Sequence, residues 1–139
     1  MNYWLIKNPP KRLTWSKFIA TGFYRFYGIR NRQARNYLMA MQPGDLVMYY
    51  QSQVEQSVRG IARVIAEPYP DPSSIDQQWI AVDLEPVSTF QLPITLAQLR
   101  CEPSLSELLL FRQPRLSVMP LSETQYKDIT RLTSRITDD

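Results

Sequence analysis

Short strand-like segments alternate with short helical segments along this chain of 139 residues. Apolar and β-branched patterns predict strands over 3–7, 46–51, 58–66, 79–87 and 116–118. Gly60, inside the third of these, marks a bend or a close approach of two backbones. Helical turns are expected over 95–100 and 104–110, and the segment PYPDPSS at 68–74 is a loop. Several short strands with peripheral helices predict an α+β domain built on a small β-barrel.

Three longer helices are predicted from capping signals at their N-termini. Thr14 caps a helix that ends at Gly22, and Asn31 caps a second helix that reaches about Met41. Ser122 and Gln125 form a capping box for a third helix, which runs to about residue 135. The second helix places Ala34, Leu38 and Met41 on its inner stripe, and Arg32, Arg35 and Asn36 outward.

One domain accounts for the whole chain. A length of 139 residues with 44% hydrophobic composition suits one core and is short for two. We expect this domain to span residues 1–136 and to be followed by a short tail, 137–139. Lys7 and two prolines interrupt the N-terminal segment before the apolar region of a signal peptide could form. No apolar run is long enough to span a bilayer. Cys101 is the single cysteine. The chain is therefore expected to be a cytoplasmic monomer without a membrane segment.

Charge is distributed unevenly along the chain. Residues 1–60 carry nine Lys or Arg against two Asp or Glu, whereas residues 61–139 carry seven against eleven. The net charge of +3 is therefore the sum of a basic region, 1–60, and an acidic region, 61–139. A localised basic field of this kind attracts polyanions.

The segment FYRFYGIRNRQARNY, residues 23–37, interleaves aromatic rings with arginines. Rings stack on bases and guanidinium groups pair with phosphates, so this composition suits a nucleic-acid surface. Rings beside arginines are also common at the edge of a small core. Trp4, Trp15 and Trp79 are assigned to the core.

Several kinds of catalytic site are excluded by composition. The chain has no histidine and one thiol, which rules out His/Cys zinc sites and Ser-His-Asp or Cys-His catalysis within it. Its four glycines are not spaced to cradle phosphates. Asp83 and Glu85 share one strand face opposite Ile80, Val82 and Leu84, a pattern typical of a solvated face. No metal, cofactor or catalytic site is predicted.

Six segments occur in colinear order along nearly the whole chain: MNYWLIK, GIRNRQARNYLMAMQPGDLVMYYQS, GIARV, YPDP, WIAVDLEPV and RQPRLSVMPLSETQY. Together they resemble the EVE domain family. Membership implies a PUA-like barrel similar to YTH and ASCH domains. It also implies binding of nucleic acid, DNA or RNA, that carries a modified base held in a pocket.

This chain departs from the family's usual motifs at three places. The family's Ser-Glu-Pro after Lys7 is Asn8-Pro9-Pro10, which keeps an amide for a base edge and loses the acid. The family's tryptophan is Phe26, whose ring offers a smaller stacking face. The family's Tyr-His-Ser is Tyr50-Gln51-Ser52, which replaces a titratable ring by an amide.

The resemblance and the basic segment together define two predicted sets of residues. The base is expected to be flipped out of its strand and stacked between Phe26 and Tyr69. Phe26 and Asn31 also have simpler interpretations, as a core ring and as a helix cap. The predicted base pocket comprises Asn8, Phe26, Arg30, Asn31, Gln33, Gln51, Ser52 and Tyr69. The predicted phosphate contacts are Lys11, Arg12, Arg25, Arg32, Arg35, Arg112 and Arg115.

Two other classes of function stay open at this point. One is an ASCH-like enzyme acting on RNA, which would need carboxylate or lysine chemistry because histidine is absent. The other is a protein-interaction module that uses the acidic half of the chain. Salt dependence distinguishes them from a nucleic-acid reader, because only phosphate contacts release counterions.

Overall fold

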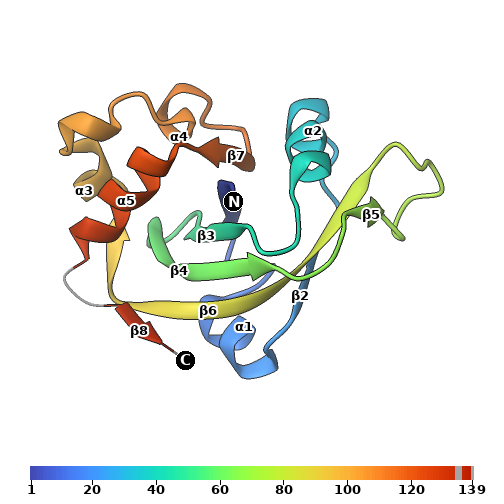
Figure 1. Cartoon of the computed structure of the whole chain (residues 1–139), viewed down its shortest axis with the longest axis horizontal. Coiled ribbons are helices and arrows are strands. Elements are labelled where there is room, and N and C mark those ends of the chain that lie inside the picture. The colour runs from blue at the N-terminus through green and yellow to red at the C-terminus, as the bar shows by residue number, and fades with distance from the viewer. Residues whose placement is uncertain (134–135, 139) are drawn as a thin grey trace.

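The computed structural model describes residues 1–133 and 136–138, and it is built around one mixed sheet that curls into a half-barrel (Figure 1). The strands are β1 (Tyr3–Asn8), β2 (Tyr24–Phe26), β3 (Leu46–Gln51), β4 (Ser57–Val64), β5 (Tyr69–Pro70), β6 (Ile80–Thr95), β7 (Val118–Leu121) and β8 (Ile136–Asp138). The helices are α1 (Trp15–Thr21), α2 (Arg32–Ala40), α3 (Leu96–Arg100), α4 (Leu109–Arg112) and α5 (Glu123–Leu132), with a 3₁₀ turn, η1, at Pro103–Leu105.

The strand order is β2-β6-β4-β3-β1-β7, and β5 and β8 also pair with β6. β1 and β3 are parallel, whereas the other strand pairs are antiparallel. Figure 1 shows β6 running along the whole length of the half-barrel, with α3, α4 and α5 grouped at one end and α2 near the other. The α+β class predicted from the alternation of strands and helices is confirmed.

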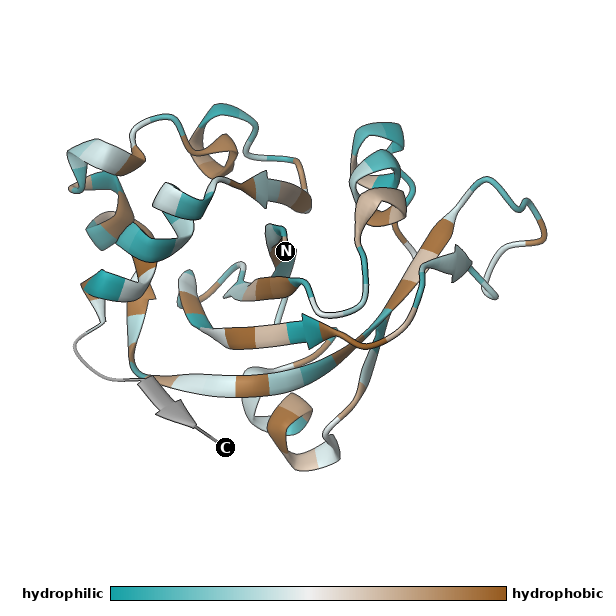
Figure 2. Ribbon diagram, viewed as in Figure 1, coloured by the Kyte–Doolittle hydropathy of each residue, from teal (hydrophilic) through white to brown (hydrophobic). Residues whose placement is uncertain are grey.

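A single apolar core fills the space between the sheet and its helices. Hydrophobic residues follow the strands, and hydrophilic ones cover the outer turns of α2 and α5 (Figure 2). Trp4 and Trp15 lie in this core as predicted, and their indole N–H groups donate to Asp45 and Thr89. Trp79 differs, because it is half-buried with the guanidinium of Arg30 over its ring.

Gly60 allows the close approach that its position in a strand predicted. A Cβ atom at this residue would lie 2.3 Å from Cζ2 of Trp15 and 2.5 Å from the carbonyl oxygen of Ser88. Strand β4 can therefore pack against α1 and β6 only with glycine at this point.

The capping predictions are confirmed at all three helices. Thr14 accepts a hydrogen bond from the backbone of Lys17, and Gly22 ends α1 with a φ of +74°. Asn31 accepts from the backbone N–H of Ala34 at 2.9 Å. The Ser122 capping box is present at α5, whose predicted last residues, 134 and 135, lie outside the described part.

Other elements differ from the prediction because pairing between distant segments decides them. β2 was not predicted. β6, which contains two prolines, extends past the predicted end at residue 87 to Thr95, because β4 and β8 pair with it. The predicted 68–74 loop contains β5, and the predicted 104–110 helix divides into η1 and α4. Thr137 and Asp138, predicted as tail, lie in β8, while Asp139 is outside the described residues.

Candidate nucleic-acid interface

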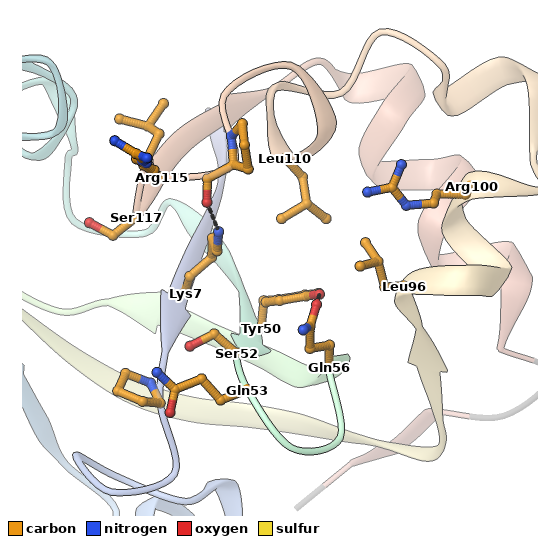
Figure 3. Close-up of a pocket in the computed structure, with 13 residues that line it drawn as sticks. Lys7, Tyr50, Ser52, Gln53, Gln56, Leu96, Arg100, Leu110, Arg115 and Ser117 are labelled. Atoms are coloured by element: carbon orange, nitrogen blue, oxygen red, sulfur yellow. Dashed lines mark hydrogen bonds between the residues drawn. The ribbon is translucent and has the colours of Figure 1, made fainter.

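A cavity lies where β1, β3 and the segment 113–117 meet. Lys7 and Tyr50 are paired in register on parallel strands, so their side chains extend from the same face of the sheet. The volume is about 450 Å³, which is within the usual range for ligand pockets. This main cavity, shown in Figure 3, is lined by Lys7, Pro9, Tyr50, Ser52, Gln53, Gln56, Leu96, Arg100, Leu110, Pro114, Arg115, Leu116 and Ser117.

Lys7 is the most unusual residue of the main cavity. Its side chain is half-buried, and its Nζ donates to the carbonyl oxygen of Pro114 at 2.6 Å. Removal from water lowers the pKa of this lysine. No described carboxylate forms an ion pair with Lys7. Among the described residues, the acceptor for its ammonium group is the carbonyl oxygen of Pro114.

Apolar and polar groups divide the main cavity between them. Leu96, Leu110 and Leu116 provide apolar walls. Tyr50 is buried and donates its hydroxyl to Oε1 of Gln56, and burial raises the pKa of that hydroxyl to about 12. The tyrosine therefore stays a neutral hydrogen-bonding group at physiological pH, and the amide Nε2 of Gln56 is left to donate elsewhere.

A second hollow of about 340 Å³ lies beside the main cavity and shares three residues with it. It is lined by Asn31, Gln33, Gln113, Pro114, Arg115 and Leu116. Because the Oδ1 of Asn31 already accepts from Ala34, its Nδ2 is the group available to a ligand. Arg115 borders both spaces.

Asp71 holds the loop that precedes α2. Its carboxylate is 1% exposed and accepts hydrogen bonds from the backbone N–H of Gly28 at 2.7 Å and from Arg30 at 3.0 Å. It also accepts from the backbone N–H and the hydroxyl of Ser73, both at 2.7 Å. Burial opposes ionisation, but these hydrogen bonds outweigh it and hold the pKa of Asp71 well below its usual range. We call Asp71 with its partners Gly28, Arg30 and Ser73 the clamp. Arg30, which was predicted in the base pocket, is part of this clamp.

Phe26 and Tyr69 do not form the stacking pocket that the sequence predicted. Phe26 is 0% exposed and packs against the ring of Tyr24, so the prediction of a pocket wall is wrong and the core interpretation holds. Arg25 and Phe26 are successive strand residues and therefore point to opposite faces. The guanidinium of Arg25 lies over the Tyr69 ring, 5.9 Å from its centroid. Tyr69 is thus on the other face, with its hydroxyl 2.5 Å from Oδ1 of Asp83.

Asn8 and Gln51 also point away from the main cavity. Both are buried, and they are paired in register one residue beyond Lys7 and Tyr50, which places them on the opposite face of the sheet. The amide of Asn8 donates to the hydroxyls of Tyr24 and Tyr49. These contacts hold the Asn8 side chain within the core and away from the main cavity, and its predicted contact with a base stays a prediction.

The structure does bring three of the predicted pocket residues to a cavity. Ser52 lines the main cavity, whereas Asn31 and Gln33 line the second hollow. The predicted phosphate contacts fall into different groups. Arg112 pairs with Glu107, Arg35 donates to the carbonyl of Gln78, and Arg12 and Arg25 lie over the rings of Tyr27 and Tyr69. Within the described residues Lys11, Arg32 and Arg115 form no ion pair.

Lys7 and Arg100 were not predicted as site residues, although both line the main cavity. A charge inside the otherwise apolar first strand, YWLIK, was the available signal for Lys7. Arg100 carried no comparable signal. Asp83 and Glu85 serve structural contacts, with Tyr69 and with Arg63 respectively. The described residues contain no group of His, Cys, Asp and Glu that would hold a metal ion, and no described helix is long and apolar enough to cross a membrane.

Comparison with known proteins decides the family. Residues 2–132 match the EVE domain. The chain belongs to the EVE domain family. Thymocyte nuclear protein 1 from mouse is 31% identical, over 94% of this chain and 73% of the mouse protein. The human protein is 30% identical over 76% of this chain and 57% of its own length, so the chain spans little more than half of that relative.

Solved structures agree with this assignment. An Agrobacterium tumefaciens protein has a TM-score of 0.93 at 34% identity, covering 96% of this chain and 94% of its own. Human THYN1 in complex with DNA that contains 5-methylcytosine has a TM-score of 0.90 at 26% identity, covering 97% and 99%. A Zymomonas mobilis ASCH protein, with a TM-score of 0.57 and 17% identity over 96% and 100%, shares the fold alone. The predicted PUA-like class is confirmed.

Proposed function

We propose that this EVE domain is a non-catalytic reader of nucleic acid, which holds a modified base, flipped out of its strand, in the main cavity. The observation that carries the proposal is the main cavity itself, which is of ligand size and has Lys7, Arg100 and Arg115 in its lining. Human THYN1, similar over 97% of this chain, has been crystallised with DNA containing 5-methylcytosine. That likeness supports a methylated base as the first ligand to test.

The walls of the main cavity suit a base without the aromatic sandwich expected from sequence. Turning a base out of its strand costs a few kcal/mol, and contact with the protein must return it. Leu110 and Leu116 supply apolar surface for the ring and for a methyl group, while Ser52 and Gln56 supply hydrogen bonds for its edge. Arg115, at the rim of both cavities, supplies a phosphate contact.

A binding role also fits the chemistry of the lining better than catalysis does. Among the thirteen residues that line the main cavity there is no carboxylate, imidazole or thiol, so general acid-base chemistry would depend on Lys7 and Tyr50. The ASCH protein shares only the fold, and it gives no catalytic residue to this chain.

Titration with matched oligonucleotides tests the proposal. Two strands that differ only in a methyl group on carbon 5 of one cytosine are compared, as single strands and as duplexes, over a range of salt concentrations. We expect tighter binding of the methylated strand and a negative salt slope. Equal affinity for both strands in all forms would refute a modified-base reader.

Three variants assign the contacts. Arg115→Ala should reduce the salt slope by about one unit, whereas Arg63→Ala, which removes the same charge away from the cavities, should leave it unchanged. Asn31→Ser keeps a capping side chain but removes the amide. If Asn31 reads a base edge, discrimination falls by about 1–3 kcal/mol without a change in melting temperature. A lower melting temperature with constant discrimination would leave it a cap alone.

A further inference from the structure

The charge of the main cavity is one-sided. Three of its lining residues are cationic, Lys7, Arg100 and Arg115, and none of the lining residues is Asp or Glu. Figure 3 shows Lys7 extending from β1 into the middle of the cavity, toward the segment that contains Arg115, with Arg100 across the space from it. Such a lining attracts an anion and repels a cation, whatever the shape of the ligand.

Among the lining residues, Lys7 has free hydrogen-bond donors that favour an anionic ligand. An ammonium group carries three donors, and the carbonyl oxygen of Pro114 accepts one of them at 2.6 Å. No other described group accepts from Nζ, and no described carboxylate pairs with it. The Lys7 side chain is half-buried, and this partial removal from water lowers the pKa of its ammonium group.

A methyl group on the base cannot bind the ammonium group of Lys7, because it offers no acceptor. An anionic oxygen can, since hydrogen bonds between an ammonium group and an anion are about twice as strong as those between neutral groups. Ser52 and Ser117, which also line the main cavity, add hydroxyl donors for a second oxygen of the same group.

We infer that the main cavity prefers a base carrying an anionic substituent, of the carboxylated pyrimidine class, over the same base carrying a methyl group, and that Lys7 contacts the anion. This inference rests on the proposed function, and it names the modification that the site selects. A backbone phosphate is the other source of anionic oxygen, and the experiment separates the two.

Binding is measured for one oligonucleotide in three forms, with cytosine, 5-methylcytosine or 5-carboxylcytosine at a single position. We expect the carboxylated form to bind about tenfold or more tightly than the methylated form. The free nucleoside 5-carboxyl-2′-deoxycytidine, which has no phosphate, should likewise bind better than its methyl counterpart.

Lys7→Met keeps the apolar stem and removes the charge, and it should abolish this preference. Lys17→Met, which removes an exposed lysine that does not line the cavity, should retain it. Lys7→Arg keeps a cation and should retain part of it, which separates loss of charge from damage to the fold.

Three outcomes would count against the inference. A carboxylated form that binds no better than the methylated form overturns it, and leaves the proposed function intact as long as both exceed plain cytosine. If Lys7→Met weakens all three forms equally and flattens the salt slope, Lys7 contacts a phosphate and the inference is wrong. Equal binding of the three forms to the unmodified protein refutes the proposed function as well.

Discussion

Replacing Asp71 by asparagine tests whether one buried carboxylate holds the loop before α2. The substitution keeps one oxygen, but it sets an amide N–H₂ group against donors, because every partner of Asp71 donates: Gly28, Arg30 and both groups of Ser73. Hydrogen bonds to a charged group contribute about 1.5–3 kcal/mol each. The Arg30 side chain is 40% exposed and retains water, so its ion pair adds less than about 1 kcal/mol.

The expected loss is about 2–3 kcal/mol of unfolding free energy at neutral pH, because Arg30 can turn to water while one of the two backbone N–H groups, that of Gly28 or that of Ser73, loses its acceptor. For a chain of this length, that corresponds to a melting temperature lower by about 6–12 °C. Chemical and thermal denaturation of both proteins measure the difference. Glu67→Gln, which neutralises an exposed acid in the preceding loop, is the matched control and should melt like the wild type.

The pH dependence has a definite sign. Because the folded-state pKa of Asp71 lies below its ordinary value of 3.8, its stabilisation is fully present above that value and is lost as the pH falls further. The wild type and Asp71→Asn should therefore converge in unfolding free energy in strong acid. A neutral-pH difference below about 0.5 kcal/mol, or a difference that stays constant into acid, would refute the clamp.

Two further predictions concern the core. Phe26→Ala should lose about 3–5 kcal/mol of unfolding free energy, because it leaves a cavity under Tyr24, while the folded fraction keeps its base preference in titrations. Loss of that preference with an unchanged melting temperature would show that Phe26 contacts the base. Gly60→Ala should lose about 1–3 kcal/mol in denaturant unfolding, because its Cβ would overlap Trp15 and the Ser88 carbonyl. A Gly60→Ala variant as stable as the wild type would show that this contact relaxes freely.

Local features of the chain were readable from its sequence. A cap depends on a side chain and a backbone N–H three residues apart, so Thr14, Asn31 and Ser122 predicted three helix starts without any knowledge of packing. A continuous run of mostly apolar residues likewise predicted β3 with its observed bounds. The colinear motifs identified the EVE family, and the lack of histidine in the composition was enough to exclude imidazole chemistry.

The site was decided by tertiary structure. Whether Arg25 or Phe26 faces solvent depends on how β2 pairs with β6, and a shift of one residue would exchange them. The main cavity joins Lys7, Ser52 and Arg115, which are far apart in the chain and meet only because β1 lies parallel to β3 and the 113–117 segment crosses above them. Sequence spacing carries no information about such meetings. The aromatic and basic stretch therefore indicated the class of ligand that we propose, but not the cavity that we propose holds it.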